Sequence, residues 1–432
     1  MVVLACAVLA TPSTAYAQPQ PAADPAAWLQ SQLDEFAIPG AAYAVIDATA
    51  VSAGAIGSQP DGSPLRTDSR MLWGSVSKPV TATVAQRLAD DGVIDLDAGI
   101  DTYLAAAGEF GATGAITVRQ LLQHTSGLPF GATALDVDDP NRRAVDVAAQ
   151  VLPGVELIDA PGAAYHYSSL GYLVVQAVLE QATGRPLAEL VHDFLPSATG
   201  AAGLSGGSRM TGGVALGFDP PNDGAGLAYG YQGGDINALA EFARWQLDPA
   251  NGAVVSETMS PGPRTGPTEQ LGLGWRISDD GTVWHTGTVP GYFSAVFIEQ
   301  AADLAVVVLL NTSGSLYEQS LYGVVRGFYD IVRGADPTPV SGSAMPALIV
   351  FAAAVGVLAL GALSVRPVRS RSAGIVWAGL ALVVIAVGWI ALPLVLDVPA
   401  RYLWLWMPDV AAVLVALPVA LGLLAVRRLR NA

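Results

Sequence analysis

Three long apolar stretches at the C-terminal end constrain what this 432-residue chain can fold into. They run approximately over residues 344–365, 373–396 and 409–426, and each has about the ~20 residues that a helix needs to span a ~30 Å hydrocarbon core. No ionisable residue lies deep within them, so they give no sign of an ion or proton path. We therefore expect three transmembrane helices that form a plain anchor over residues 344–432.

Arginines flank these stretches unevenly and predict their orientation. Three arginines lie between the first two stretches and three follow the third, whereas the loop at 397–408 carries tyrosine and tryptophan, as is typical of a membrane interface. The positive-inside rule then places both arginine clusters and the C-terminus in the cytoplasm, and the preceding domain outside. The N-terminus agrees, because a short apolar run followed by Ala15-Tyr16-Ala17 is typical of a signal peptide, which we place at residues 1–17. The expected location is the cell membrane, with three spans.

The net charge also differs between the C-terminal region and the residues before it. Seven arginines and two aspartates follow Ser343, a balance of +5, so −21 falls on the residues before it. This acidic region lacks the basic stripe of a nucleic-acid binder, and no nucleic-acid partner is expected. The single cysteine, Cys6, excludes a disulfide framework. Four scattered histidines without ligand spacing predict no metal site, and we expect no cofactor.

Residues 18–335 have the pattern of one mixed α/β domain, followed by a Pro/Ser/Gly-rich linker at 336–343. Strand-like segments lie near both ends of the domain, and its middle, roughly 100–255, is rich in helices and loops. This distribution predicts a sheet assembled from the two ends, with a helical lobe beside it. The expected strands are 41–47, 51–57, 271–278, 283–287, 295–299 and 304–310, and the expected helices include 76–91 and 316–333.

The strongest candidate for a catalytic residue is a lysine. Lys78 is the one lysine among 21 basic residues, so the chain uses arginine wherever a positive charge is enough. Only lysine can lose its proton when it is desolvated and then act as a base. Ser75 precedes it by three residues, and positions i and i+3 share one face of a helix at about 5–6 Å. The pair places an amine beside a hydroxyl, which needs a base to become a nucleophile.

Two further motifs follow Ser75-Val76-Ser77-Lys78, namely Tyr167-Ser168-Ser169 and His285-Thr286-Gly287. In order and spacing the three resemble the S-x-x-K, Y-x-N and K/H-T-G motifs of the serine β-lactamase-like superfamily, which includes class C β-lactamases, D-alanyl-D-alanine carboxypeptidases and related esterases. The segment from Ile116 to Pro129 also resembles this superfamily, and we interpret its His124 as a structural residue. The resemblance covers roughly residues 26–335. It implies the fold of β-lactamases and penicillin-binding proteins, an antiparallel sheet flanked by helices with a helical lobe.

The resemblance also implies roles for the residues that match. Ser75 would be the acylated nucleophile, Lys78 its general base, and Tyr167 the hydroxyl that passes a proton to the leaving group. A tyrosine with an ordinary pKa near ~10 would be useful only if Lys78 stabilised its anion, so the two would act as a pair. The backbone N–H groups of Ser75 and Thr288 would form the oxyanion hole. The third motif would line the pocket as a strand edge, through His285, Thr286 and Gly287.

Two positions depart from the family motifs. Ser169 stands where the second motif has asparagine, so the side-chain amide that grips the substrate's own amide is missing. His285 stands where many members have lysine, so a permanent cation for a substrate carboxylate is not guaranteed. Both departures predict slow β-lactam hydrolysis.

We therefore expect a membrane-tethered serine hydrolase that works through an acyl-enzyme on Ser75 outside the cytoplasm. The leading substrate class is a D-amino-acid peptide derived from peptidoglycan, as for a D-alanyl-D-alanine carboxypeptidase, because the tether holds the site beside the cell wall. The alternatives are an esterase or a weak class C-type β-lactamase. An alternative of another class is a non-hydrolytic sensor of β-lactams or wall fragments. The expected partners are a small peptide, ester or β-lactam, and the lipid bilayer.

Overall fold

The computed structural model describes residues 24–105, 110–340 and 371–430, together with isolated positions between 342 and 360. The expected signal peptide at 1–17, including Cys6, lies outside the described residues. Most of the first expected transmembrane stretch, 344–365, also lies outside them. The boundaries of the domain, the linker and the anchor therefore stay predictions.

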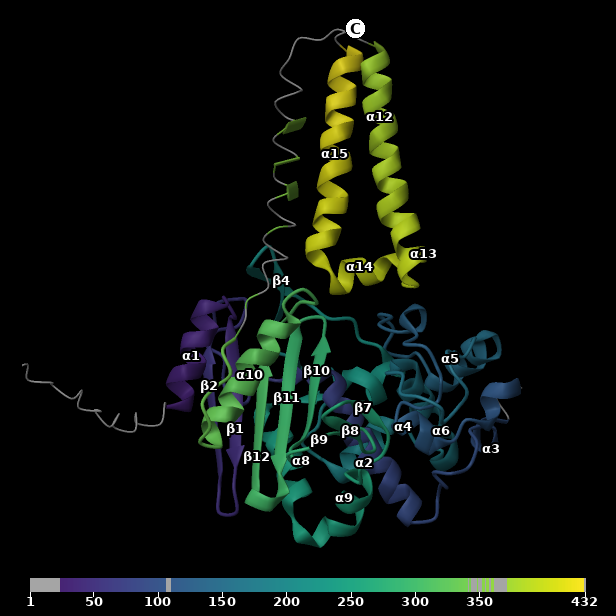
Figure 1. The fold of residues 1–432 in the computed structure, drawn as a ribbon, viewed down its shortest axis with the longest axis vertical. Coiled ribbons are helices and arrows are strands. Elements are labelled where there is room, and N and C mark those ends of the chain that lie inside the picture. The colour runs from purple at the N-terminus through teal and green to yellow at the C-terminus, as the bar shows by residue number, and fades with distance from the viewer. Residues whose placement is uncertain are drawn as a thin grey trace, which may run out of the picture.

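An eight-stranded antiparallel sheet forms the centre of the front domain (Figure 1). Its strand order, β2-β1-β12-β11-β10-β9-β8-β7, places strands from the two ends of the domain side by side. β1 (Gly40–Ile46) pairs with β2 (Val51–Gly57) and with β12 (Leu304–Leu310). β11 (Tyr292–Glu299) then joins β12 to β10 (Val283–Val289). The sheet expected from the sequence is confirmed.

The expected strand at 271–278 is wrong, because the chain turns there. β8 (Glu269–Leu271) and β9 (Arg276–Ser278) are separate strands, and Gly274 between them has a φ of +74° that a β-strand cannot accommodate. β7 (Arg264–Gly266) completes this end of the sheet. β9 pairs with β10 only at Val283 and Trp284. The rest of β10 therefore has an edge without a β9 partner, and β10 contacts the 3₁₀ helix Gly74–Val76.

Helices cover both faces of the sheet, so β12 can be apolar along its whole length. α1 (Pro25–Glu35) and α10 (Glu318–Val332) pack on one face around a cluster that includes Phe293, Phe297 and Phe328. α8 (Ile236–Leu247) packs on β12 and β1 from the other face. Its N-cap is Asp235, whose carboxylate accepts from the backbone N–H of Ala238.

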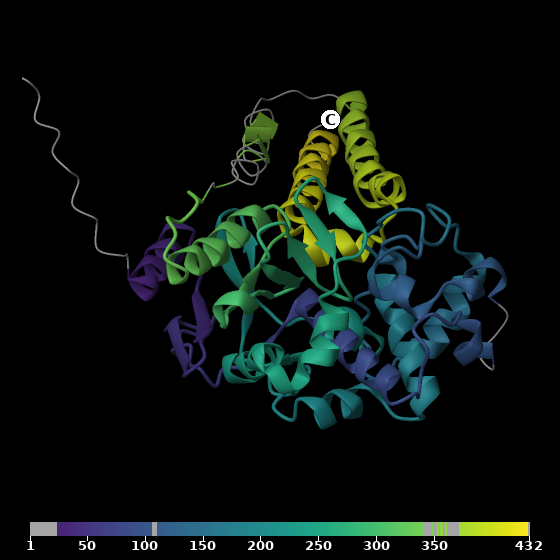
Figure 2. The ribbon, with the colours of Figure 1, turned by 60° about the horizontal axis from the view of Figure 1, so that its bottom comes forward.

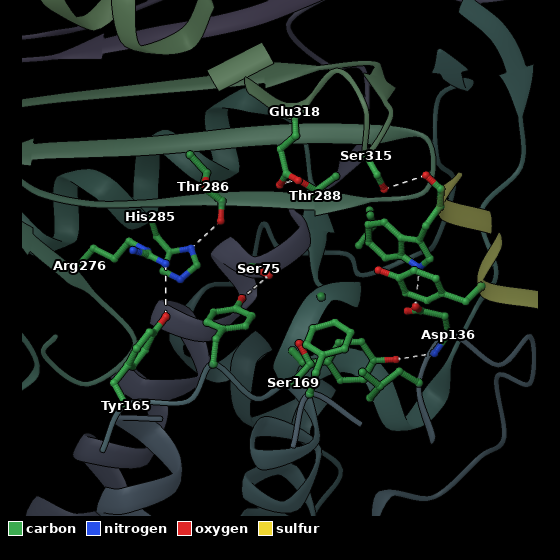
Figure 3. A pocket seen from close by; sticks show the side chains of 18 residues that line it. Ser75, Asp136, Tyr165, Ser169, Arg276, His285, Thr286, Thr288, Ser315 and Glu318 are labelled. Carbon is green, nitrogen blue, oxygen red and sulfur yellow. Dashed lines mark hydrogen bonds between the residues drawn. The ribbon is translucent and has the colours of Figure 1, made fainter. Parts of the chain in front are cut away.

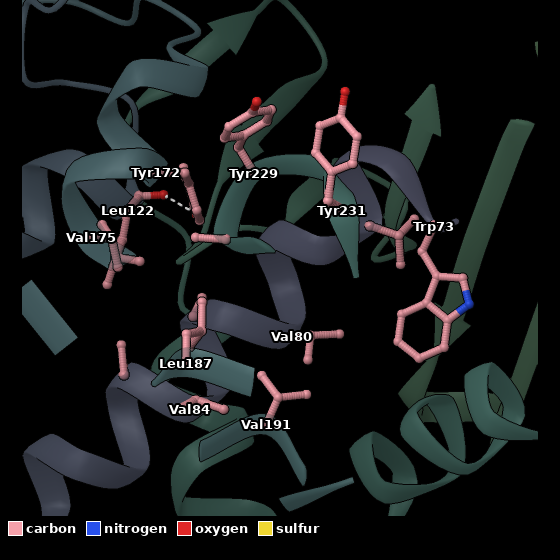
Figure 4. Close-up of a cluster of buried hydrophobic side chains, with 14 of the residues drawn as sticks. Trp73, Val80, Val84, Leu122, Tyr172, Val175, Leu187, Val191, Tyr229 and Tyr231 are labelled. Carbon is pink, nitrogen blue, oxygen red and sulfur yellow. Dashed lines mark hydrogen bonds between the residues drawn. The ribbon is translucent and has the colours of Figure 1, made fainter. Parts of the chain in front are cut away.

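The helical lobe lies to one side of the sheet (Figure 2). It contains α3 (Asp101–Leu104), α4 (Val118–Leu122), α5 (Ala144–Val151), α6 (Ser169–Thr183) and α7 (Leu187–Phe194). α2 (Ser77–Asp90) runs between the lobe and the sheet, and residues 77–86 of it are buried. Side chains from α2, α4, α6, α7 and the π-helical turn Leu227–Tyr231 converge in one apolar core (Figure 4). This core isolates the start of α2 from water. The remaining short elements are α9 (Gly252–Thr258), the strands β3 (Met71–Leu72) and β6 (Gly233–Gly234), and a small sheet of β4 (Gly207–Thr211), β5 (Val214–Phe218) and β13 (Thr312–Ser313).

Two helical segments near the C-terminus are long and apolar enough to cross a membrane, judged by length and composition. The first, Arg371–Leu396, consists of α12 (Arg371–Ala386), a π-helical turn and α13 (Leu392–Leu396), and the second is α15 (Pro408–Arg430). They contain the second and third expected stretches. α12 and α15 pack side by side and extend away from the front domain (Figures 1 and 2). The expected interfacial loop between them is a short helix, α14 (Ala400–Trp406), which lies at the surface of the front domain.

Candidate active site

Ser75 lies in the short 3₁₀ helix Gly74–Val76 that leads into α2, directly against strand β10. The approach is close because both sides carry glycine. A Cβ on Gly74, which has a φ of +53°, would lie 2.5 Å from the backbone nitrogen of Thr288. A Cβ on Gly287 would lie 2.0 Å from the Trp73 carbonyl oxygen and 2.8 Å from the Ser75 nitrogen. The two glycines thus let the backbones of Ser75 and Thr288 approach each other closely, as an oxyanion hole formed by their N–H groups requires.

The amine of Lys78 is fully buried beneath Ser75. Its Nζ lies 3.0 Å from Ser75 Oγ, 3.3 Å from Ser169 Oγ and 2.8 Å from the Tyr229 carbonyl oxygen. Burial lowers the pKa of Lys78 well below its usual value, although the carboxylate of Asp136 acts in the opposite direction. In this arrangement Nζ donates to all three oxygens, Ser75 Oγ included. Loss of one amine proton would leave a lone pair facing Ser75 Oγ that can take the hydroxyl proton.

Tyr167 approaches Ser75 from the other side. Its hydroxyl donates to Ser75 Oγ at 2.8 Å, and burial raises the pKa of Tyr167, so the phenol is protonated. Lys78 Nζ lies 4.9 Å from the centre of the Tyr167 ring and therefore contacts the face of the ring rather than forming an ion pair with a phenolate. In this resting arrangement Ser75 Oγ accepts hydrogen bonds from both Tyr167 and Lys78.

His124 holds the second motif in place. It has a φ of +55°, and its Nδ1 accepts a hydrogen bond from the Ser168 backbone N–H at 3.1 Å. Its ring lies 4.4 Å from the ring of Tyr167 between centroids. Burial lowers the pKa of His124 far below its usual range, so the ring is neutral. This geometry agrees with the expectation of a structural role for His124.

A cavity of about 400 Å³ opens over Ser75 (Figure 3). Six of the eight predicted site residues line it, namely Ser75, Tyr167, Ser169, His285, Thr286 and Thr288. The other two, Lys78 and Gly287, are not part of the lining. The sequence therefore identified residues from three distant segments that the fold brings together.

The cation in this pocket is Arg276, which the sequence analysis missed. His285 is buried, and its Nδ1–H donates to the Thr286 carbonyl at 2.5 Å. Burial and the nearby charge of Arg276 lower the pKa of His285, so the third motif supplies no charge of its own. Arg276 lies beside it in the pocket wall and pairs with Glu269 on β8 and with the Tyr165 hydroxyl (Figure 3). The available signal was weak, because Arg276 is one of 20 arginines and becomes a neighbour of His285 only through the pairing of β9 with β10.

This arrangement of a buried amine, a hydroxyl nucleophile and a phenol beside a strand edge is that of a serine hydrolase. The family model described as Beta-lactamase matches residues 26–324, and the chain belongs to the beta-lactamase family.

Relatives within this family differ in what their names describe. Esterase EstB of Burkholderia gladioli is 28% identical over 330 residues, which cover 58% of this chain and 80% of the esterase. Penicillin-binding protein 4 of Amycolatopsis lactamdurans is 32% identical over 169 residues, covering 37% of this chain but only 43% of that protein. Among solved structures, D-alanine carboxypeptidase AmpC of Burkholderia cenocepacia has a TM-score of 0.60 at 17% identity and covers 72% of this chain and 99% of its own. The last comparison concerns the fold alone.

The buried amine leads to a prediction about stability. The unfolded chain binds a proton on Lys78 up to its usual pKa of 10.5, whereas the fold disfavours that proton. Between the lowered folded pKa and 10.5 the unfolded state binds more protons, so the contribution of this group to stability rises with pH. Lys78→Met removes this dependence. We expect the melting temperature of Lys78→Met, relative to the wild type, to fall as the pH rises from about 7 to about 10.

Thermal unfolding scans over this pH range measure the difference. Ser75→Ala is the control, because it keeps Lys78 and should retain the pH slope of the wild type. Parallel slopes for the wild type and Lys78→Met would contradict a lowered pKa for the buried amine.

Proposed function

We propose that this protein is an extracytoplasmic, membrane-tethered serine hydrolase that cleaves D-amino-acid peptides through an acyl-enzyme on Ser75. The observation that carries the proposal is the hydrogen bonding around Ser75 Oγ, which lies 2.8 Å from the Tyr167 hydroxyl and 3.0 Å from Lys78 Nζ. A phenol that can donate a proton and an amine whose pKa is lowered by burial therefore meet at one nucleophile.

The acylation step uses the residues in the order of their contacts. Ser75 Oγ bonds to the substrate carbonyl carbon while its proton moves to Lys78 Nζ. The backbone N–H groups of Ser75 and Thr288 stabilise the negative charge that develops on the carbonyl oxygen. The bond to the leaving group then breaks as Tyr167 donates its proton to the leaving atom, and the proton held by Lys78 restores the phenol. The pair expected from the sequence thus acts by proton exchange, with no resting phenolate.

Deacylation runs through the same groups in reverse. Water attacks the ester carbon while its proton moves through Tyr167 to Lys78, and the ester bond breaks as Ser75 Oγ recovers a proton from Lys78. Ser169 stands beside Lys78 and offers a hydroxyl where the family motif has an amide. It keeps the amine oriented but gives the substrate a weaker grip.

The role of the base is tested by Lys78→Arg, which keeps the positive charge but cannot lose it. We expect kcat/KM to fall by much more than tenfold, because a tenfold loss is only about 1.4 kcal/mol and removal of the base should cost more. Ser75→Ala should be equally inactive and provides the blank. Purified protein with a 4-nitrophenyl ester gives the measurement, and a Lys78→Arg variant with more than about a tenth of wild-type kcat/KM would refute the assignment of the base.

The proposed substrate class rests on Arg276. A guanidinium at the pocket wall favours a substrate with a free carboxylate on the leaving side, as a peptide ending in D-alanine has. The names of two similar structures, a D-stereospecific amidohydrolase from Streptomyces and the carboxypeptidase described above, agree with this class. An esterase is the second candidate, because Esterase EstB of Burkholderia gladioli matches over 330 residues and Ser169 lacks the amide grip.

Arg276→Gln distinguishes these candidates. A charge-assisted hydrogen bond to a carboxylate contributes about 1.5–3 kcal/mol, so the preference for a D-alanyl-D-alanine peptide over its C-terminal amide should fall by about 10- to 100-fold. Arg264→Gln is the matched control, because Arg264 is an exposed arginine on β7 that pairs with Asp279. Both peptides should be followed by release of the C-terminal residue. An unchanged preference would remove the carboxylate from the proposed substrate and favour the esterase.

The membrane tether is proposed from the two apolar helices. Their large apolar side chains are mostly exposed, among them Ile375, Leu382 and Leu394. Soluble proteins rarely expose an apolar surface of this extent, which supports burial of these helices in a bilayer. The proposed anchor spans residues 344–432 after the linker at 336–343, and the hydrolase domain spans 18–335 after a signal peptide at 1–17. Three spans, with the first at 344–365, would put the hydrolase domain outside and the C-terminus in the cytoplasm.

Single cysteines test this topology in a Cys6→Ser background. Ala400→Cys stands at the start of α14 and Ser372→Cys at the start of α12, and both positions are exposed. We expect an impermeant maleimide to label Ala400→Cys in intact cells and Ser372→Cys only after lysis. Equal labelling of the two positions in intact cells would overturn the proposed orientation.

A further inference from the structure

The short helix α14 forms part of the catalytic pocket although it belongs to the apolar C-terminal region. Tyr402 and Trp406 lie one helical turn apart on the same face of α14, and both line the cavity that contains Ser75. The Trp406 indole N–H donates to Asp136 Oδ2 at 2.8 Å, and the Trp406 carbonyl accepts from Ser315 Oγ at 2.7 Å. Figure 3 shows the ribbon of this segment closing the end of the pocket where Asp136 and Ser315 lie.

The same helix holds the loop that forms the neighbouring wall. The Arg401 guanidinium donates to the carbonyls of Thr133 and Leu135 at 2.8 and 2.9 Å. Asp136 follows this loop with a φ of +56°, is buried, and also accepts from the Tyr231 hydroxyl at 2.9 Å. Side chains of both α14 and the front domain therefore fix this end of the pocket.

The two ends of the pocket differ in character. Arg276, Tyr165 and His285 stand at one end, and Ser75 lies between them and Asp136 (Figure 3). The α14 end carries the aromatic rings of Tyr402 and Trp406, together with Ser315 and with Asp136, whose Oδ2 accepts from the Trp406 indole. A substrate bound across Ser75 would thus meet a guanidinium at the first end and aromatic rings at the second.

We propose that α14 is a wall of the acyl subsite, where Tyr402 and Trp406 contact the acyl portion of the substrate and limit its length. This inference rests on the proposed function, because a leaving group held by Arg276 leaves the α14 end for the acyl portion. The matching class of acyl group is short and apolar, with the indole of Trp406 as the end stop.

A series of 4-nitrophenyl esters tests the wall, since the leaving group stays constant while the acyl chain lengthens from acetate through butyrate to octanoate. For the full-length wild type we expect kcat/KM to fall from butyrate to octanoate. Trp406→Ala should raise the ratio of kcat/KM for octanoate over acetate by about tenfold, the effect of about 1.4 kcal/mol. Trp406→Phe, which keeps a ring, should give a smaller rise.

Trp404→Ala is the matched control, because Trp404 is on the same helix with 53% of its surface exposed and does not line the cavity. It should leave the chain-length ratio unchanged. A ratio that is the same in the wild type and both Trp406 variants would overturn the inference while Ser75-dependent hydrolysis upheld the proposed function. An equal shift in Trp404→Ala would also overturn it, because the effect would then come from general loosening of α14. Absence of Ser75-dependent hydrolysis on every ester would refute the proposed function and this inference together.

Discussion

The burial of one amine is the constraint on which the rest of this molecule depends. Lys78 sits without solvent contact at the start of α2, and its three hydrogen-bond partners come from the 3₁₀ helix at Ser75, the first residue of α6 and the π-helical turn at Tyr229. A base can be neutral near pH 7 only if water is kept from it, so the sheet, the lobe and the turn must close around this point. In the proposed mechanism the apolar core around α2 therefore serves the base as well as the fold.

The pocket also separates its charges by position. Two histidines near Ser75 are kept neutral by burial, whereas the guanidinium of Arg276 retains its charge at the pocket wall. The Asp136 carboxylate stands at the other end and opposes the loss of the proton from Lys78. In the proposed mechanism a substrate carboxylate thus meets an arginine that does not titrate, and proton transfer is left to Lys78 and Tyr167. Binding of that carboxylate would then stay constant over a pH range in which Lys78 changes its protonation.

Local sequence patterns predicted the elements whose cause is local. The lone lysine three residues after Ser75 predicted a buried amine beside a hydroxyl, and the continuous apolar run of β12 predicted a buried strand. The resemblance to the family motifs predicted that the distant segments meet in one site. The prediction failed where the cause is tertiary. One strand was expected at 271–278 because the apolar alternation continues across Gly274, where the chain turns. Arg276 was missed because nothing in the sequence distinguishes it from the other arginines. The segment at 397–408 was read as an interfacial loop, since aromatic residues are typical of an interface and nothing in their spacing indicates a catalytic pocket.

The contacts of α14 have a consequence for how such a protein can be divided. A chain cut after the linker would keep Ser75, Lys78, Tyr167 and the oxyanion hole, and would lose Tyr402, Trp406 and the hold of Arg401 on the loop at 133–135. The soluble fragment would be a hydrolase with one end of its pocket open to water, and its substrate range would describe the fragment rather than the intact protein. The proposed anchor is in this sense not an interchangeable module, because exchanging it for another segment would also remove the side chains that line one end of the pocket.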